Sequence, residues 1–180
     1  MIYYAIQVKT CSEEKFIKLF KNNNQESTLQ FYFPKRKLNI RKAGKIKLST
    51  SAVFPGYVFI ESLSEEELFD HQLKLRHTDG FYRFLKSNKN ITPLTDNDLQ
   101  LVLHFIKTVG AVANVSKVYF NENSRIVVAE GPLSGLEGNI IKIDKRKGRA
   151  KIKLDLFDDS FTVDLAFEII NSVESNKKAS

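Results

Sequence analysis

The feature that most constrains the fold is a strict alternation of apolar and charged residues close to the C-terminus. In residues 149–156 every second side chain is apolar, and Arg, Lys and Asp occupy the positions between. Successive side chains of a strand point to opposite faces, so this segment is predicted to be a strand with one buried face and one basic, solvated face. As a helix, the same segment would scatter its apolar residues around the axis.

A second strand is predicted just before it, at residues 139–144. The two strands are separated by the short basic turn 145–148, in which Gly148 can adopt a positive φ. The pair is therefore predicted to form a hairpin.

The preceding segment 131–138 contains Gly131, Gly135 and Gly138, which indicates a tightly bent backbone. A phosphate-binding loop is the alternative interpretation. Such loops lead into the N-terminus of a helix, whereas this one leads into a predicted strand. The pattern therefore favours a structural bend.

The C-terminal third of the chain is predicted to be all β. Short strands are expected at 125–129, 139–144, 149–156, 160–165 and 167–173. Five short strands in so short a segment are typical of a small closed barrel. Residues 109–121 show neither a helical nor a strand period, and we interpret them as a linker.

The N-terminal part has the predicted order βαββαβα. Strands are expected at 3–8, 29–33, 53–61 and 81–85, and helices begin after Ser12, Ser64 and Thr95. Ser64 and Glu67 have the spacing of a capping box. Leu68, Phe69 and Leu73 supply an apolar stripe to the second helix, and residues 34–53 form a long polar loop. An antiparallel sheet with packed helices satisfies this order, so the fold class is α+β.

Positive charge is concentrated in two segments. Residues 35–47 and 142–153 contain 14 of the 28 Lys and Arg residues and one of the 21 acidic residues, so the remainder carries a net charge of −6 although the chain carries +7. Two basic patches on an acidic body predict an anionic partner, with nucleic acid favoured over a membrane because neither patch is an amphipathic helix. Each patch, taken alone, is also compatible with a solvated loop or strand face.

The residues that catalysis or metal binding would need are few. Cys11 and the histidines His71, His77 and His104 show no metal-ligand spacing, and nothing brings a histidine to Cys11. We therefore expect no enzyme activity, no metal and no cofactor. The single cysteine, the lack of a long apolar run and the lack of a signal-like start predict a cytoplasmic protein.

The sequence resembles the NusG-type transcription elongation factors over nearly its whole length. The resemblance is carried by YYAIQVKTCSEEKF at the start, by FPKRKLNIRKAGKIKLSTSAVFPGYVFI, and by HTDGFYRFL followed by TPLTDNDL. The bent segment has the GPxxGxxG core of that family's KOW motif. Each motif alone would be suggestive, but their occurrence in this order is specific.

The resemblance implies an N-terminal domain at 1–108, a linker at 109–121, a five-stranded SH3-like KOW barrel at 122–174 and a disordered tail at 175–180. It implies that the first domain docks on the clamp helices of RNA polymerase and suppresses pausing. The docking candidates transferred by position are Tyr3, Tyr4, Phe54, Pro55, Gly56, Tyr57 and Phe81. The barrel would recruit Rho or the ribosome, or would stay with the polymerase.

The segment GPLSGLEGNIIKIDKRKGRAKIKL resembles specialised paralogues of the LoaP or RfaH kind more than the housekeeping factor. This resemblance implies an operon-specific antitermination factor, and we expect a monomer. Such a factor would read an RNA hairpin or non-template DNA. The first candidate patch is Lys35, Arg36, Lys37, Arg41, Lys42 and Lys45, and the second is Lys145, Arg146, Lys147 and Arg149. A housekeeping factor and a ribosome-associated RNA-binding protein remain alternatives, and so does a helical packing of the KOW segment.

Overall fold

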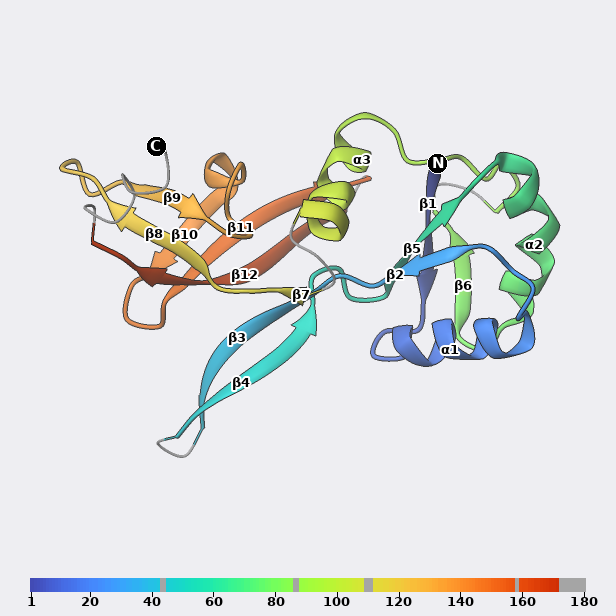
Figure 1. Ribbon diagram of the computed structural model, residues 1–180, viewed down its shortest axis with the longest axis horizontal. Helices are drawn as coiled ribbons and strands as arrows, with labels where there is room; N and C mark the ends of the chain where they lie inside the picture. The colour runs from blue at the N-terminus through green and yellow to red at the C-terminus, as the bar shows by residue number, and fades with distance from the viewer. Residues whose placement is uncertain (43–44, 86–87, 109–111, 158, 172–180) are drawn as a thin grey trace. The chain divides into compact units, whose positions relative to one another are not determined.

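The computed structural model describes residues 1–42, 45–85, 88–108, 112–157 and 159–171 (Figure 1). These residues form two compact units. The first unit comprises Met1–Phe33 and Phe54–Leu103, and the second comprises Pro34–Val53 and His104–Ser180. The tail predicted at 175–180 lies outside the described residues.

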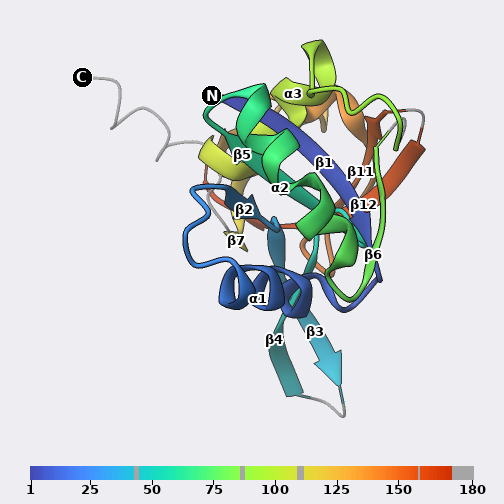
Figure 2. The same cartoon turned by 90° about the vertical axis from the view of Figure 1, so that its right-hand side faces the viewer.

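The first unit is built on a four-stranded antiparallel sheet in the order β2-β5-β1-β6. Its elements are β1 (Ile2–Val8), α1 (Glu13–Asn23), β2 (Gln30–Tyr32), β5 (Tyr57–Ser62), α2 (Glu65–His77), β6 (Phe81–Phe84) and α3 (Asp96–Leu103). Figures 1 and 2 show α1 and α2 on the same face of the sheet. The predicted βαββαβα order and the antiparallel sheet are confirmed for these elements.

The core of the first unit lies between the helices and one face of the sheet. Phe16 and Phe20 of α1 and Leu68 and Leu75 of α2 are fully buried against apolar residues of β1 and β5 such as Ile6. Burial of side chains of this size supplies roughly 1.5–3 kcal/mol each, so this layer is a main source of the unit's stability.

The apolar stripe predicted for α2 is only partly correct. Leu68 is buried as predicted, but Phe69 is 46% exposed and Leu73 is 61% exposed. The inward face of the helix continues from Leu68 to Leu75, seven residues later, through half-buried polar positions. The prediction is wrong for Phe69 and Leu73 because it takes apolar residues to mark the buried face, whereas the buried face of α2 includes polar residues.

The start of α2 confirms the predicted capping box. The Glu67 backbone N–H donates to Ser64 Oγ at 3.2 Å, which satisfies one of the free donors of the first turn. Glu67 Oε2 in return accepts from the Leu63 N–H at 2.7 Å and from Ser62 Oγ at 2.6 Å. The Glu67 side chain thus bonds one residue before the N-cap, to Leu63 rather than Ser64, and holds the chain as it leaves β5.

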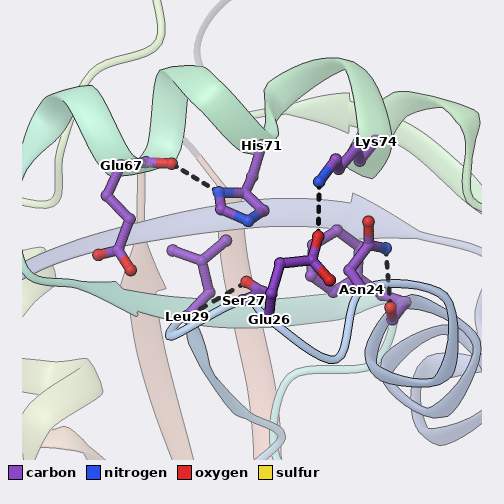
Figure 3. A network of polar contacts seen from close by, with 8 residues as sticks. Asn24, Glu26, Ser27, Leu29, Glu67, His71 and Lys74 are labelled. Carbon is purple, nitrogen blue, oxygen red and sulfur yellow. Dashed lines mark hydrogen bonds and ion pairs between the residues drawn. The ribbon is translucent and has the colours of Figure 1, made fainter.

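Polar contacts also hold the connection between α1 and β2 (Figure 3). Lys74 Nζ lies 2.8 Å from Glu26 Oε1, and Asn24 Nδ2 donates to the Phe20 carbonyl at 2.8 Å. His71 Nδ1 lies 2.9 Å from the Glu67 carbonyl on the same helix, so the ring is tied to α2. The exposed ion pair adds little energy, and the buried amide supplies the more effective restraint.

The second unit contains two sheets. One is the hairpin of β3 (Lys35–Lys42) and β4 (Lys45–Ala52), extended at its base by the short strand β7 (Val112–Ala113). The other is five-stranded, in the order β10-β11-β12-β8-β9. Its elements are β8 (Ser116–Phe120), β9 (Ile126–Glu130), the 3-10 turn η2 (Glu137–Asn139), β10 (Ile140–Asp144), β11 (Arg149–Leu156) and β12 (Asp159–Ile169). The π-helical turn η1 (His104–Thr108) precedes them.

The five-stranded sheet curls because β12 changes partner along its length. Its first part pairs antiparallel with β11, and Phe167–Ile169 pair parallel with β8. The single strand β12 replaces the two strands predicted at 160–165 and 167–173. Strand β8 lies within residues 109–121, so the linker predicted for this segment contains a strand.

The hairpin β3–β4 corrects another prediction, because residues 34–53 were expected to be a loop. All eight residues of β3 pair with β4, from Lys35 opposite Ala52 to Lys42 opposite Lys45. Neither face of this ribbon is continuously apolar, so it lacks the alternation that marks a half-buried strand. In Figure 1 the end of the hairpin extends away from the five-stranded sheet of the same unit.

Three described glycines of the predicted bend and turn have positive φ angles. Gly131 has φ +105°, Gly135 has φ +79° and Gly148 has φ +60°. The chain after Gly135 enters a 3-10 turn and then β10, so the interpretation of 131–138 as a structural bend is supported over a phosphate-binding loop.

Candidate functional site

The turn at residues 54–57 leads into β5 and is held by backbone and side-chain hydrogen bonds. The Tyr57 N–H donates to the Phe54 carbonyl at 3.2 Å, with Pro55 second and Gly56 third in the turn. Gly56 has φ +82°, the left-handed conformation that this position of a type II turn requires. Pro55 is exposed at its apex.

A buried carboxylate anchors this turn. Glu13 is only 3% exposed, and its Oε1 accepts a hydrogen bond from the Gly56 N–H at 2.7 Å. The Gly56 carbonyl in turn accepts from the Val8 N–H at 2.8 Å. Glu13 lies in the first turn of α1, and no local sequence pattern predicts its contact with the 54–57 turn.

The face of the sheet opposite the helices carries a cluster of aromatic side chains, which we call the aromatic face. In the strand register Tyr3 lies opposite Glu61, and Phe59 lies between Ala5 and Tyr32. The aromatic face comprises Tyr3, Tyr32, Tyr57 and Phe59. Phe54 joins it through an edge-on contact with Phe59, with ring centroids 5.5 Å apart.

One hydrogen bond on this face affects a pKa. Tyr32 Oη donates to Glu61 Oε2 at 2.6 Å. This hydrogen bond, together with partial burial and the nearby negative charge of Glu61, raises the pKa of Tyr32 to about 12. The hydroxyl therefore stays protonated as a donor at neutral pH and fixes the Glu61 carboxylate at the edge of the aromatic face.

The seven docking candidates occupy different environments. Tyr4 belongs to the buried core between sheet and helices, and Phe81 packs against that core. Tyr3 and Tyr57 lie on the aromatic face but are only 5% and 4% exposed. Of the seven candidate residues, Pro55 is the exposed one.

In the second unit, basic side chains lie on the outer face of β10 and β11, beside Asp164 of β12. The register places Lys142 opposite Lys151, and Lys151 opposite Asp164. In the next row Asp144 lies opposite Arg149. The apolar residues of β11 alternate with these and are buried, as the sequence predicted.

These side chains line a cleft of about 210 Å³, which we call the basic cleft. Its lining residues are Lys142, Asp144, Lys147, Arg149, Lys151 and Asp164. Two of them, Lys147 and Arg149, belong to the second predicted patch. Lys142 and Lys151 are not part of the second predicted patch. The predicted hairpin 139–156, with its turn at 145–148, nevertheless implies that they face each other.

The other basic residues of the turn point elsewhere. Lys145 Nζ lies 3.7 Å above the ring centroid of Phe120, a cation–π contact. Arg146 is exposed and is not among the residues that line the cleft. The second predicted patch is therefore divided between the basic cleft and the opposite side of the turn.

The first predicted patch lies on the hairpin β3–β4. Lys37 Nζ donates to Asn114 Oδ1 at 3.1 Å, and Lys45 is exposed near the end of the ribbon. Lys35 and Arg36 lie at the base, where β3 pairs with Val112–Ala113. The side chains of Arg41 and Lys42 lie outside the described part of the structure.

No group of three or more His, Cys, Asp or Glu residues placed to hold a metal ion occurs in the part of the chain that the structure covers. Among the described helices, none is long and apolar enough to cross a membrane. Cys11, the single cysteine, is exposed.

Comparison with known proteins agrees with the resemblance noted in the sequence. The family model described as "Transcription termination factor nusG" matches residues 1–103, more than half of the chain. The chain belongs to the NusG family. Family membership, together with the α+β architecture, confirms the predicted family and fold class.

Curated relatives match this NusG-family chain along most of its length. The "Transcription termination/antitermination protein NusG" of Campylobacter jejuni is 28% identical over 176 residues, covering 95% of this chain and 97% of the relative. The protein of the same name from Thermus thermophilus is 27% identical, with 92% and 95% covered. That of Bacillus subtilis is 26% identical, with 83% and 82% covered. The similarity thus includes the second unit.

Proposed function

We propose that this NusG-family protein is a non-enzymatic, cytoplasmic elongation factor that binds RNA polymerase through its first unit, suppresses pausing and promotes antitermination. The observation that carries the proposal is the family match over residues 1–103, which includes the 54–57 turn and the aromatic face. The relatives that match over most of the chain are named transcription termination/antitermination proteins. The activity would consist of binding, with no bond made or broken.

The docking surface that we propose is centred on the 54–57 turn and the adjoining aromatic face. Pro55 is exposed at the turn, and Tyr57 and Tyr3 follow on the aromatic face. An apolar surface of this kind suits the side of an amphipathic helix, such as the clamp helices of the polymerase. Tyr3 and Tyr57 are themselves buried in the structure, so Pro55 is the exposed part of this surface. Tyr4 and Phe81 would act by supporting the sheet.

Substitution of Tyr57 tests this surface. Tyr57→Ala is expected to weaken association with RNA polymerase about tenfold, since truncation of an aromatic anchor commonly costs more than ~1 kcal/mol of binding free energy. The measurement is quantitative co-purification of polymerase with the tagged protein from lysate, with and without nuclease. The matched control is Tyr82→Ala, which truncates a tyrosine that is 59% exposed on β6.

The control variant should capture as much polymerase as the unaltered protein. Circular dichroism melts of both variants establish that they remain folded. Equal capture by Tyr57→Ala and Tyr82→Ala would reject the assigned surface. Recovery of ribosomal particles in place of polymerase would favour the alternative of a ribosome-associated RNA-binding protein.

We further propose that the protein contacts nucleic acid through its basic residues, as an operon-specific paralogue would. The support is the clustering of cations on the β3–β4 hairpin and on the outer face of β11, where phosphate contacts are expected. An RNA hairpin or the non-template DNA strand is the expected ligand. A housekeeping role, with Rho or the ribosome bound by the five-stranded sheet, is the competing proposal.

The salt dependence of RNA binding tests this part. A Lys37→Gln/Lys45→Gln double variant is expected to reduce the slope of log affinity against log salt by about 0.7 for each lost phosphate contact. Fluorescence anisotropy of a labelled single-stranded RNA between 50 and 200 mM salt measures it. The control double variant Lys9→Gln/Lys18→Gln makes the same charge change at exposed positions of the first unit. Identical slopes for both variants would contradict a role of the hairpin.

A further inference from the structure

The basic cleft on the outer face of β10, β11 and β12 has a composition that no strand-packing requirement explains. Four of its six lining side chains are cationic and two are carboxylates, so the lining has a formal excess of two positive charges. Its volume of about 210 Å³ is below the roughly 300–1,000 Å³ of pockets for whole small molecules. The cleft therefore suits a small anionic group.

The cross-strand register makes the empty cleft electrostatically unfavourable. Lys142 and Lys151 lie directly opposite each other on neighbouring antiparallel strands. Like charges at opposed positions destabilise a sheet, whereas opposite charges stabilise it. An anion bound between the two lysines would remove this repulsion.

The carboxylates of the cleft offset this charge only in part. Lys151 Nζ lies 3.6 Å from Asp164 Oδ1, and Lys147 Nζ lies 3.6 Å from Asp144 Oδ2. Both distances are longer than a charge-assisted hydrogen bond of about 2.7–2.9 Å. These are loose, partly exposed ion pairs, which leave the ammonium groups able to bind an additional anion.

A further cation reaches this region from the other sheet of the unit. Strand β3, which carries Arg36 at its base, packs against β12, and Arg36 is close enough to Asp164 of β12 and to Arg149 to interact electrostatically with both. Burial lowers the pKa of Arg36; the charge of Asp164 opposes this effect and that of Arg149 adds to it. Its side chain donates to the Ala52 carbonyl, while the buried Nε has no hydrogen-bond partner among the described residues.

We propose that the basic cleft binds a phosphate group of a nucleic-acid backbone, with Lys142, Lys147 and Lys151 as direct ligands and Arg36 at its border. The two basic segments of the sequence, which lie about a hundred residues apart, would then form one continuous binding surface. This inference rests on the nucleic-acid part of the proposed function and adds the position at which the backbone is held.

The lining residues favour a phosphate over a base. None of the six residues that line the cleft is aromatic, so the cleft offers no stacking platform for a base. Lysine binds phosphate as a mobile point charge without reading sequence. The cleft would therefore position a strand, and sequence would be read by other residues.

Substitutions at the cleft test the site with the full-length protein. Lys142→Gln is expected to weaken binding of a 12-nucleotide oligouridylate roughly three- to tenfold and to reduce its salt slope by about 0.7. The matched control is Lys153→Gln, which also removes one lysine charge, but from β11. Lys153 lies outside the cleft and pairs with Asp155 at 3.3 Å. Fluorescence anisotropy supplies both affinities.

Inorganic phosphate serves as the second probe, because it is small enough to report on the cleft alone. Titration is expected to shift the backbone amide resonances of Lys142, Lys151 and Asp164, and oligouridylate should displace the phosphate. Arg36→Gln should weaken phosphate binding at least threefold if Arg36 borders the site. If Arg36→Gln binds phosphate with unchanged affinity, the two basic segments do not form one continuous binding surface.

The outcomes separate this inference from the broader proposal. Equal effects of Lys142→Gln and Lys153→Gln on RNA binding, with no phosphate shifts in the cleft, would overturn the inference and leave nucleic-acid binding standing. If the protein binds phosphate but no RNA, the phosphate group in the cleft does not come from a nucleic-acid backbone. The nucleic-acid part of the proposed function would then be overturned as well. Shifts with both probes and competition between them would support the inference.

Discussion

Gly131→Ala is expected to destabilise the second unit by roughly 3 kcal/mol or more, because two unfavourable terms act together. Gly131 has φ +105°, a conformation that residues with a side chain rarely adopt. An added Cβ would also lie 2.7 Å from Ser116 Cα, which is backbone of β8, a strand paired on both sides. Relief of that overlap requires the bend to move away from β8. The Leu133 N–H would then lose its 3.0 Å hydrogen bond to the buried Ser116 Oγ.

Gly135→Ala is the matched control for this prediction. Gly135 lies in the same bend with φ +79°, but no heavy atom lies within 4 Å of its added Cβ. The expected cost is therefore only the left-handed strain of about 1–2 kcal/mol. Urea unfolding monitored by the amide resonances of β8 and β9 measures both variants. Equal destabilisation by the two substitutions would show that the approach to Ser116 carries no energetic weight.

The second unit shows which local features a sequence can predict. The alternation in β11 and the turn at Gly148 depend on a few neighbouring residues, and both were predicted correctly. Strand β8 was missed because its inward positions, Ser116 and Val118, do not distinguish it from a polar connection. Its pairing with β12 is parallel and comes from residues about fifty positions away. No local pattern encodes that contact.

The hairpin β3–β4 failed for a different physical reason. Strand recognition depends on one apolar face, and in this ribbon Leu38 is buried while the nearby Ile40 is 38% exposed. A ribbon that buries so few apolar side chains has no continuous apolar stripe from which a strand could be predicted. The same property makes the proximity of Arg36 to Arg149 and Asp164 unpredictable, because it depends on how the base of the hairpin meets β12.

The candidate docking residues illustrate how register decides between structural and functional roles. Tyr3 and Tyr4 are neighbours in the sequence and were transferred together from the family resemblance. In the sheet Tyr4 points to the helices and Tyr3 to the aromatic face. Alternation alone predicts that they separate, but it does not say which of them joins the core. The packing of Phe16 and Phe20 against the Tyr4 side decides it.

Glu13→Ala is expected to destabilise the first unit by about 2–3 kcal/mol, since it removes a charged acceptor and leaves a buried donor unsatisfied. The Gly56 N–H would lose its 2.7 Å hydrogen bond to Glu13 Oε1, and water has little access at a site where the side chain is 3% exposed. Glu13→Gln keeps an oxygen acceptor and should cost about half as much. Thermal unfolding of the full-length protein measures both.

Glu14→Ala is the control, because Glu14 shares the first turn of α1 but is exposed. Its expected cost through the helix dipole is about 0.3–1 kcal/mol. A residue-specific readout separates the roles: the Gly56 amide should exchange with solvent faster in Glu13→Ala and at the unaltered rate in Glu14→Ala. If the turn is part of the docking surface, Glu13→Ala should also capture less polymerase at a temperature at which it remains folded. Unchanged exchange at Gly56 would show that the carboxylate does not hold the turn.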